Sequence, residues 1–204
     1  MPDAAAPGPG RMSSDARREQ IIAAAVAVFG AKGYVGTTTD DVARAASISQ
    51  PYVVRLFGTK EKLFLAALDD ALETLLEAFT KAASDGGPDE PQEKMGTAYL
   101  GLIQMRGLHQ ILSHAFLLGA HPVIGPVARA GFARVWRFLR DDAELSADAA
   151  RQFLAEGMLI NTMLGLRMTE KYGQDAGMTE LLDACFPQSI GAVLEEAPRV
   201  GDPW

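Results

Sequence analysis

The feature that most restricts the fold of this chain is a dense series of helix boundaries in its first third. Thr38-x-x-Asp41 is a capping-box pattern with Asp in place of the usual Glu. Ser47-Ile48-Ser49 follows as a turn, and Ser49 is placed to cap the next helix. Pro51 fits the first turn of that helix, because backbone N–H groups there have no helical partner. Thr59 is placed to cap another helix. The pattern predicts two short helices joined by a three-residue turn.

Helical spacing of apolar residues continues on both sides of this unit. A helix is predicted over 16–32, where Gly33 is suited to end it in a left-handed conformation. A longer one is predicted over 60–83, with Phe64, Leu68, Ala71, Leu75 and Phe79 on one stripe. Further helices are expected at about 91–107, 109–119, 126–141, 147–170, 179–186 and 188–196. Alternating β-branched runs and hairpin dipeptides are missing from the sequence. The prediction is an all-α fold of about nine to ten helices.

The domain organisation follows from these boundaries. Residues 1–12, rich in Pro, Gly and Ala, are expected to form a disordered arm. Residues 13–59 are expected to form a three-helix helix-turn-helix domain, and residues 60–204 a second helical domain. Charge divides near the same point: residues 1–64 hold eight Lys and Arg against six Asp and Glu, whereas residues 65–204 hold 11 against 20. Such asymmetry suggests two functions on one chain, although the net charge of −7 predicts no general affinity for nucleic acid.

Composition also bears on the compartment. The single cysteine, Cys185, cannot form an internal disulfide, which favours a reducing environment. The N-terminal residues lack the apolar core of a signal peptide, and no apolar run reaches the roughly 18 residues of a membrane span. A cytoplasmic protein without a membrane partner is therefore expected.

In a helix-turn-helix unit, the second short helix lies in the DNA major groove and presents its N-terminal residues to the bases. On that helix, Gln50, Pro51, Tyr52 and Arg55 are expected to face outward and Val53, Leu56 and Phe57 inward. Gln suits adenine, Arg suits guanine or phosphate, and Tyr can stack or donate to phosphate. A helix N-terminus beside an ammonium at Thr59-Lys60 suits a phosphate. The predicted DNA contacts are Thr38, Thr39, Ser49, Gln50, Pro51, Tyr52, Arg55, Thr59 and Lys60.

The ordered residues from about 18 to 68 resemble the TetR family of bacterial transcriptional regulators. The resemblance rests on EQIIAAAVAVFGAKGYVGTTTDDVARAASISQPYVVRLFGTKEKLFLAAL. It implies a DNA-binding domain, a helical ligand-binding and dimerisation domain, and usually repression of a palindromic operator that a small molecule relieves. Val54 stands where the family's phosphate-contacting Tyr is common, so Tyr52 is a candidate replacement. Ser47 replaces a glycine that is common in the turn.

The second domain offers candidates for a small, largely apolar effector. Apolar walls with a few polar groups are typical of a ligand pocket and equally of an ordinary core. Arg106 and His114 are the better polar candidates because each lies in an apolar stretch, and Asn161 is expected either in the pocket or at a two-fold axis. The predicted pocket residues are Met95, Tyr99, Leu102, Arg106, His114, Phe116, Phe132, Trp136 and Asn161.

Oligomeric state is predicted from the segment beginning at Gly157, GMLINTMLGLRM, which is apolar around almost its whole circumference. We expect it to join a four-helix homodimer interface with the segment near 179–196, and a central core helix of a monomer is the alternative. The predicted interface residues are Gly157, Asn161, Leu164, Gly165 and Met168.

Other function classes have weaker support. No metal site or other cofactor is expected, since His109 and His114 lie about 140° apart on a helix and no carboxylate or cysteine completes a set. Phosphate loops, nucleophile motifs and paired carboxylates are missing, so no enzyme is expected. The alternatives left open are a dimeric regulator without an effector and, less favoured, an apolar-ligand-binding protein or enzyme.

Overall fold

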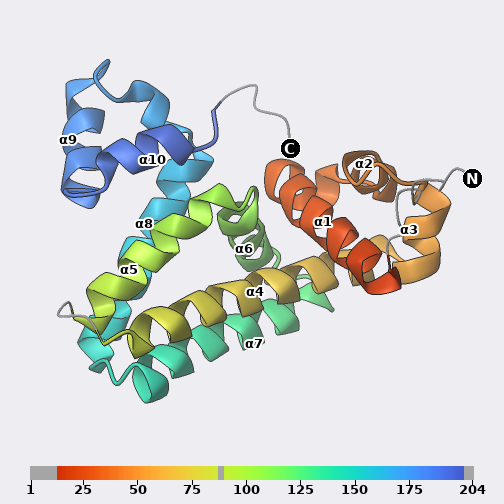
Figure 1. The fold of residues 1–204 in the computed structure, drawn as a ribbon, viewed down its shortest axis with the longest axis horizontal. Helices are drawn as coiled ribbons and strands as arrows, with labels where there is room; N and C mark the ends of the chain where they lie inside the picture. The colour runs from red at the N-terminus through yellow and green to blue at the C-terminus, as the bar shows by residue number, and fades with distance from the viewer. Residues whose placement is uncertain (1–12, 87–89, 200–204) are drawn as a thin grey trace, which may run out of the picture.

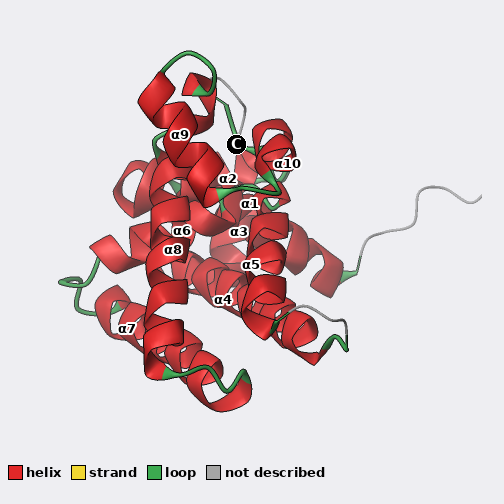
Figure 2. Ribbon diagram, turned by 90° about the vertical axis from the view of Figure 1, so that its left-hand side faces the viewer, coloured by secondary structure: helices red, strands yellow, loops and turns green. Residues whose placement is uncertain are grey.

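The computed structural model describes residues 13–86 and 90–199, which form helices and connecting loops without a strand (Figures 1 and 2). The expected arm at 1–12 lies outside the described residues. The helices that confirm the predicted all-α fold are α1 (Ser14–Gly36), α2 (Thr39–Ala45), α3 (Gln50–Phe57), α4 (Lys60–Ser84), α5 (Pro91–Gly101), α6 (Leu108–Leu117), α7 (Ile124–Arg137), α8 (Ala147–Gly165), α9 (Ala176–Cys185) and α10 (Ile190–Glu196).

The start of each early helix follows from a capping side chain. The hydroxyl of Ser13 accepts from the N–H of Ala16, and that of Thr59 accepts from Lys62, each at 3.1 Å. These bonds satisfy N–H groups that have no partner in the first helical turn. Gly33 has a φ of 68° and a ψ of 172°, which confirms the predicted positive φ but kinks α1 instead of ending it.

Helix α4 connects the two halves of the molecule. Its predicted stripe of Phe64, Leu68, Ala71, Leu75 and Phe79 is buried throughout. The first turns of α4 pack on α1, and the later turns pack on α5 and α7, which runs alongside it (Figure 1). With 25 residues, α4 is about 37 Å long. Helix α4 therefore forms a continuous connection between the helix-turn-helix unit and the helices of the second half.

The apolar core is continuous across the predicted boundary at residues 59 and 60. One cluster of buried side chains extends from Ile21 in α1 to Phe153 in α8. A second, smaller cluster joins α8 to the last two helices and contains Ile103, Met163, Leu164, Leu182, Phe186, Val193 and Ala197. Helix α1 also packs closely on α6 of the second half, so the two halves share one core. The division into two domains at residues 59 and 60 stays a prediction.

Three helices end earlier than the sequence pattern predicts. Helix α5 ends at Gly101 rather than near 107, and a 3-10 turn follows at Leu102–Gln104. Gly107 then adopts a φ of 83° where its backbone meets α1, so the helix cannot continue through it. Helix α7 becomes a π-helical turn at Phe138–Asp142. Helix α8 ends at Gly165 instead of near 170, because Arg167 has a φ of 56°.

Candidate nucleic-acid interface and ligand pocket

The support of the helix-turn-helix unit is built around Asp41. Its carboxylate accepts from the N–H and the hydroxyl of Thr38, and Thr38 accepts from the Asp41 N–H, which completes the predicted capping box. Lys32 of α1 donates to the same carboxylate at 2.8 Å and Arg44 at 2.7 Å. The Lys32 hydrogen bond, followed by those from Thr38, holds the pKa of Asp41 well below its usual value. The carboxylate thus ties α2 to α1.

The turn between α2 and α3 is tight. Ser47 has a φ of 51°, a left-handed conformation that a side chain makes costly. The N–H of Ile48 donates to the carbonyl of Ala43 at 2.9 Å, which closes the turn after α2. Ser49 occupies the N-cap position of α3, but its hydroxyl makes no capping hydrogen bond, contrary to the prediction. The turn is set by backbone hydrogen bonds instead.

Helix α3 has one anchored side and one exposed side. Val53 and Phe57 are buried against the other helices, as predicted. Leu56 was predicted to face inward, yet it is 37% exposed, because it lies beside the buried pair rather than between them. Val54 is exposed to a similar extent, so an apolar side chain occupies the surface position where a phosphate-contacting Tyr was considered.

The exposed side of α3 carries preorganised polar groups. The Arg55 guanidinium lies 4.7 Å from the centre of the Tyr52 ring, an attractive cation–π distance. Gln50 donates from its amide to the hydroxyl of Thr39 at 3.1 Å, which links the first turns of α2 and α3. Pro51 and Ser49 are exposed beside them. Five of the predicted contacts thus lie at the N-terminal half of α3 or directly beside it.

Lys60 is placed differently from the prediction of a free ammonium beside a helix N-terminus. Its Nζ donates to the carbonyl of Tyr34 at 3.0 Å and lies 4.5 Å from the centre of the Tyr34 ring. That ring also packs edge-on against Phe64 and His121. Lys60 therefore joins the end of α1 to the first turn of α4, while Thr59, which is exposed, caps α4.

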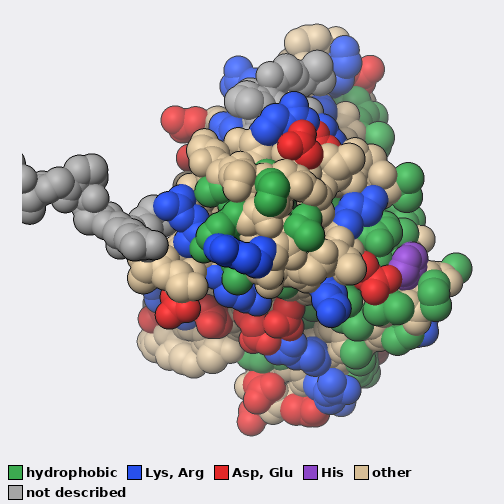
Figure 3. All heavy atoms as spheres, turned by 90° about the vertical axis from the view of Figure 1, so that its right-hand side faces the viewer, with side chains coloured by type: hydrophobic (Ala, Val, Ile, Leu, Met, Phe, Trp, Pro, Cys, Tyr) green, Lys and Arg blue, Asp and Glu red, His purple; other side chains and the backbone are tan. Residues whose placement is uncertain are grey.

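Figure 3 faces this end of the molecule. Lys and Arg side chains surround a small group of hydrophobic side chains near the middle of the view, and acidic side chains gather mainly below them. Salt screens charges beyond about 8–10 Å, so this local face matters more for phosphate than the net charge of the chain. Basic side chains on this face are the local charge that an anionic partner would meet.

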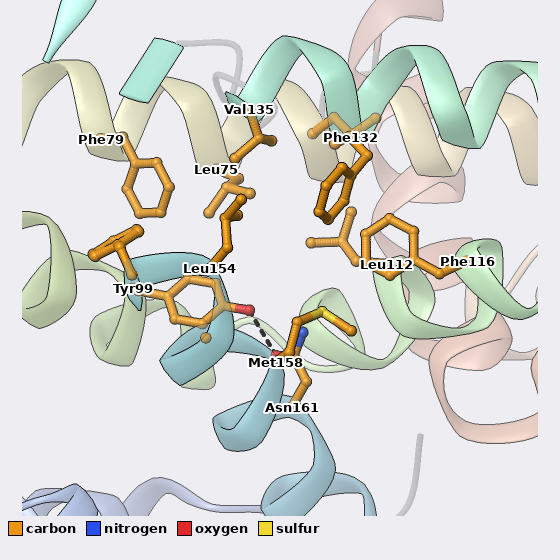
Figure 4. Close-up of a pocket in the computed structure, with 13 residues that line it drawn as sticks. Leu75, Phe79, Tyr99, Leu112, Phe116, Phe132, Val135, Leu154, Met158 and Asn161 are labelled. Atoms are coloured by element: carbon orange, nitrogen blue, oxygen red, sulfur yellow. Dashed lines mark hydrogen bonds between the residues drawn. The ribbon is translucent and has the colours of Figure 1, made fainter. Parts of the chain in front are cut away.

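A narrow apolar pocket lies inside the second half, between α4, α6, α7 and α8 (Figure 4). Its open volume is about 50 Å³, room for on the order of four water molecules at about 10–15 Å³ each. Phe116 and Phe132 pack edge-to-face at 5.5 Å beside Met158, which is partly exposed. The lining residues are Leu72, Leu75, Phe79, Tyr99, Leu112, Phe116, Phe132, Val135, Phe153, Leu154, Gly157, Met158 and Asn161.

The polar centre of the pocket is a hydrogen bond between two buried side chains. The Tyr99 hydroxyl donates to Asn161 Oδ1 at 2.6 Å (Figure 4). His109 packs on the Tyr99 ring with centroids 4.6 Å apart, and its Nε2 lies 3.2 Å from the Tyr99 carbonyl. Burial lowers the pKa of His109 to about 4 and raises that of Tyr99. The imidazole is therefore neutral at pH 7, and the group is an uncharged hydrogen-bonding centre.

The structure divides the predicted pocket residues into three groups. Tyr99, Phe116, Phe132 and Asn161 line the apolar pocket. Met95, Leu102 and Trp136 pack in or against the core instead. Arg106 and His114 line a separate polar cleft beside α1, because Gly107 turns the chain between them. The residues of α4 that line the pocket were missed, since their even apolar stripe gave no signal beyond ordinary core packing.

Comparison with known proteins supports the geometry of the N-terminal helices. Residues 21–67 match the family model described as bacterial regulatory proteins, tetR family. A crystal structure of a TetR-like transcriptional regulator from Rhodococcus sp. RHA1 shares the fold with a TM-score of 0.59. That match covers 89% of this chain and 99% of the other at 21% identity. The match over residues 21–67 groups the N-terminal helices with the TetR family of bacterial regulatory proteins.

Proteins that match part of this chain are named as regulators of transcription. The HTH-type transcriptional activator FasR of Mycolicibacterium smegmatis is 33% identical over 72 residues, which are 35% of this chain and 33% of FasR. The matched segments span between a quarter and about half of the length of the curated relatives. A crystal structure of multidrug binding protein EbrR complexed with imidazole is 25% identical, with a TM-score of 0.51 over 74% of this chain and 80% of that one. The proteins that match the N-terminal part of this chain are thus named as regulators of transcription.

The predicted interface residues lie on two sides of α8. Asn161 and Leu164 are buried within the protomer, and Gly157 packs against Tyr99, so these three do not form an exposed stripe. Gly165 is exposed, and Met168 is half-buried. The apolar side chains that α8 does expose are Met158 and Leu159, with Leu166 directly after the helix. The assignment of these residues to a dimer interface stays a prediction.

Other classes of site receive no support from the described residues. Within residues 13–86 and 90–199, no group of three His, Cys, Asp or Glu is arranged to hold a metal ion. None of the described helices is long and apolar enough to cross a membrane.

Proposed function

We propose that this chain is a TetR-family regulator that acts in the cytoplasm as a homodimer and binds a palindromic operator, with α3 of each protomer in a major groove. The observation that carries the proposal is the exposed Arg55 beside the half-buried Tyr52, on a helix anchored by the buried Val53 and Phe57. A helix held in this way keeps its side chains in one arrangement, so little conformational entropy is lost on binding. One α3 reads only a few base pairs, and two-fold symmetry doubles that to two half-sites.

We assign different roles to the two cations near the interface. Arg55 is exposed and suited to guanine or phosphate, whereas the Lys60 ammonium already donates to Tyr34. Arg55→Ala should lower operator affinity and, where Arg55 contacts phosphate, make the salt dependence shallower by about one unit of slope. Lys60→Ala should lower affinity without changing the slope, since its role is to position α4. Titrations by mobility shift at several salt concentrations separate the two roles.

The homodimer is proposed to form through the exposed apolar side chains at Met158, Leu159 and Leu166. Exposed apolar side chains grouped on one element are typical of interaction sites. Leu159→Glu should convert the dimer to a monomer in sedimentation experiments at micromolar concentration. A wild-type protein that sediments as a strict monomer would contradict the dimer.

The effector is proposed to be a small apolar molecule that enters the pocket around Tyr99 and Asn161. The pocket volume of about 50 Å³ is far below the roughly 300–1,000 Å³ of ligand pockets, so entry requires α4, α7 or α8 to move. Because α4 begins next to α3, such a movement changes the spacing of the two recognition helices. Effector and operator then favour different conformations, which is the basis for proposing repression relieved by the effector. Coupling of this kind is typically about 1–3 kcal/mol.

The experiment that tests DNA binding is selection of binding sites from random duplexes by the purified protein. Enrichment of a palindromic sequence is expected, with loss of binding in Arg55→Ala. Arg151→Ala is the matched control, because Arg151 is an exposed arginine on α8, far along the chain from α3. Enrichment of no sequence, or equal binding by wild type and Arg55→Ala, would refute the proposal.

A regulator without an effector is the second candidate, and the small volume of the pocket favours it. Thermal-shift measurements with a panel of hydrophobic compounds distinguish the two. A compound that raises the melting temperature of wild type but not of an Asn161→Leu variant supports the effector proposal. Absence of any such compound supports the effector-free regulator.

A further inference from the structure

A polar cleft of about 720 Å³ lies between the DNA-binding helices and the second half of the molecule. One wall is α1, through Ala27, Gly30 and Ala31. The opposite walls are the 103–107 segment, α6, the C-terminal end of α8 and residues 195–199, which surround α1 from the other side (Figure 1). The cleft shares only Asn161 with the apolar pocket, so it is a separate site.

Arg167 is the unusual residue of this cleft. Its Nη1 is buried, and among the described residues it is the buried side-chain polar atom without a hydrogen-bond partner. Leaving a buried donor unpaired is costly, and more so for a charged group. The backbone of Arg167 is also left-handed, with a φ of 56°, which is unfavourable for a residue with a side chain. Two such costs at one residue are typical of functional positions.

The remaining walls define the chemistry of a ligand. Arg106 and Arg199 add positive charge to that of Arg167, against Glu195 and Glu196 on the 195–199 wall. A guanidinium recognises the planar carboxylate through paired N–H donors. Apolar side chains also line the cleft, namely Ile103, Leu117 and Leu164, and they suit an apolar body attached to that carboxylate.

The position of the cleft gives its occupant access to the joint between the two halves. The backbones of Gly30 in α1 and Gly107 before α6 meet there without side chains between them. His114 of α6 holds the same place, since its Nε2 lies 3.2 Å from the Gly30 carbonyl. A molecule that contacts both walls therefore affects the angle between α1 and α6 directly, without passing through the apolar pocket.

We propose that this cleft is a second ligand site that binds a small organic carboxylate, with Arg167 as the residue that holds the carboxylate. Its occupant stabilises one arrangement of α1 on α6. That a ligand here changes operator affinity rests on the proposed function, whereas binding of the carboxylate does not.

The test uses benzoate as the probe and the full chain without DNA. Isothermal titration should show benzoate binding to wild type, with affinity reduced about tenfold or more in Arg167→Gln, the effect of losing a charge-assisted hydrogen bond. Benzyl alcohol, which has the same ring without the charge, should bind at least tenfold more weakly than benzoate if about 1.4 kcal/mol or more comes from the ion pair. Arg151→Gln is the matched control on α8 and should bind benzoate as wild type does.

Circular dichroism and sedimentation first establish that Arg167→Gln is folded. If it is not, crystals of wild type soaked with 4-iodobenzoate replace it, and an iodine peak within the cleft is expected. Benzoate binding that is equal in wild type and a folded Arg167→Gln variant, no binding at all, or an iodine peak only in the apolar pocket would each overturn the site.

A separate measurement addresses regulation. Operator affinity of wild type is compared with and without benzoate, and with chloride at matched ionic strength. Failure of the protein to select any duplex refutes the proposed function and leaves the carboxylate site standing. Benzoate binding with unchanged operator affinity refutes only the regulatory role.

Discussion

Replacing Gly30 with alanine tests whether the α1–α6 joint depends on direct backbone contact. A Cβ added at Gly30 would lie 2.5 Å from Cα and 2.6 Å from the carbonyl oxygen of Gly107. Carbon atoms normally pack at about 3.5–4.0 Å, so the two segments must separate by about 1 Å. Neither partner is a flexible side chain that can turn away. Gly30→Ala should therefore push α6 away from α1.

The expected change in stability follows from two opposing terms. Overpacking of a close-packed interior costs about 1–3 kcal/mol, and rigid backbone partners favour the upper end. Replacing a helical glycine with alanine stabilises the folded state by about 1 kcal/mol through helix propensity. We expect a net loss of about 2 kcal/mol in the free energy of unfolding. For a chain of this size, each kcal/mol lowers Tm by about 2–4 °C, so the shift is about 4–8 °C.

Gly96 supplies the matched control, because it lies within α5 and a Cβ there would meet nothing within 4 Å. Gly96→Ala should raise stability by about 1 kcal/mol through helix propensity alone. Calorimetry of both variants measures the difference, and duplex titration shows whether the displaced joint also changes affinity for the selected operator. If Gly30→Ala melts at or above the temperature of Gly96→Ala, the reasoning about the joint is wrong.

Three further variants test the turn, the buried polar centre and its pH dependence. Ser47→Gly should raise the free energy of unfolding by about 0.5–1 kcal/mol, because relief of the left-handed backbone strain exceeds the cost of the extra freedom of glycine in the unfolded chain. Urea denaturation measures the change, and a loss of stability would contradict the turn geometry. Tyr99→Phe should lower the free energy of unfolding by about 1–3 kcal/mol, because it leaves Asn161 Oδ1 without its donor. Tyr172→Phe removes only an exposed hydrogen bond to Asp183 and should change the free energy of unfolding by less than about 0.5 kcal/mol. Because the pKa of His109 falls from 6.5 to about 4 on folding, the unfolded chain binds the proton more tightly between these values. Stability should therefore be complete above pH 6.5 and decrease by about 3 kcal/mol as pH falls to 4, and His109→Gln should remove most of that slope in denaturation series.

The fold was predictable where local signals agreed with one another. The Thr38–Asp41 capping box, the Thr59 cap and the buried stripe of α4 were each visible as residue type at fixed spacing, and each is confirmed. The ends of helices in the second half were harder to predict from the sequence. Gly107 stops the chain from remaining helical because its backbone meets α1, and that long-range contact leaves no mark in the local pattern.

The candidate sites were predictable to different depths. Position around the α3 axis correctly placed Val53 and Phe57 inward, but Leu56 lies at the edge of the buried sector, where spacing alone does not decide exposure. The assignment of the Lys60 ammonium to phosphate stays a prediction, and the sequence does not show that Tyr34, 26 residues earlier, accepts a hydrogen bond from it. Arg106 and His114 were assigned to the effector pocket, but they line a separate polar cleft, and the sequence could not show that the apolar pocket and this cleft are distinct.

The position of Asn161 between the apolar pocket and the polar cleft has a thermodynamic consequence. Its carboxamide oxygen accepts from the Tyr99 hydroxyl, and its NH₂ group carries the two donors that a ligand on either side can use. A ligand in the apolar pocket or in the polar cleft that accepts a hydrogen bond from this amide alters what the other site can bind. By thermodynamic linkage, each ligand must then change the binding affinity of the other by the same factor. The response of the regulator to both ligands together would differ from the sum of its responses to each alone.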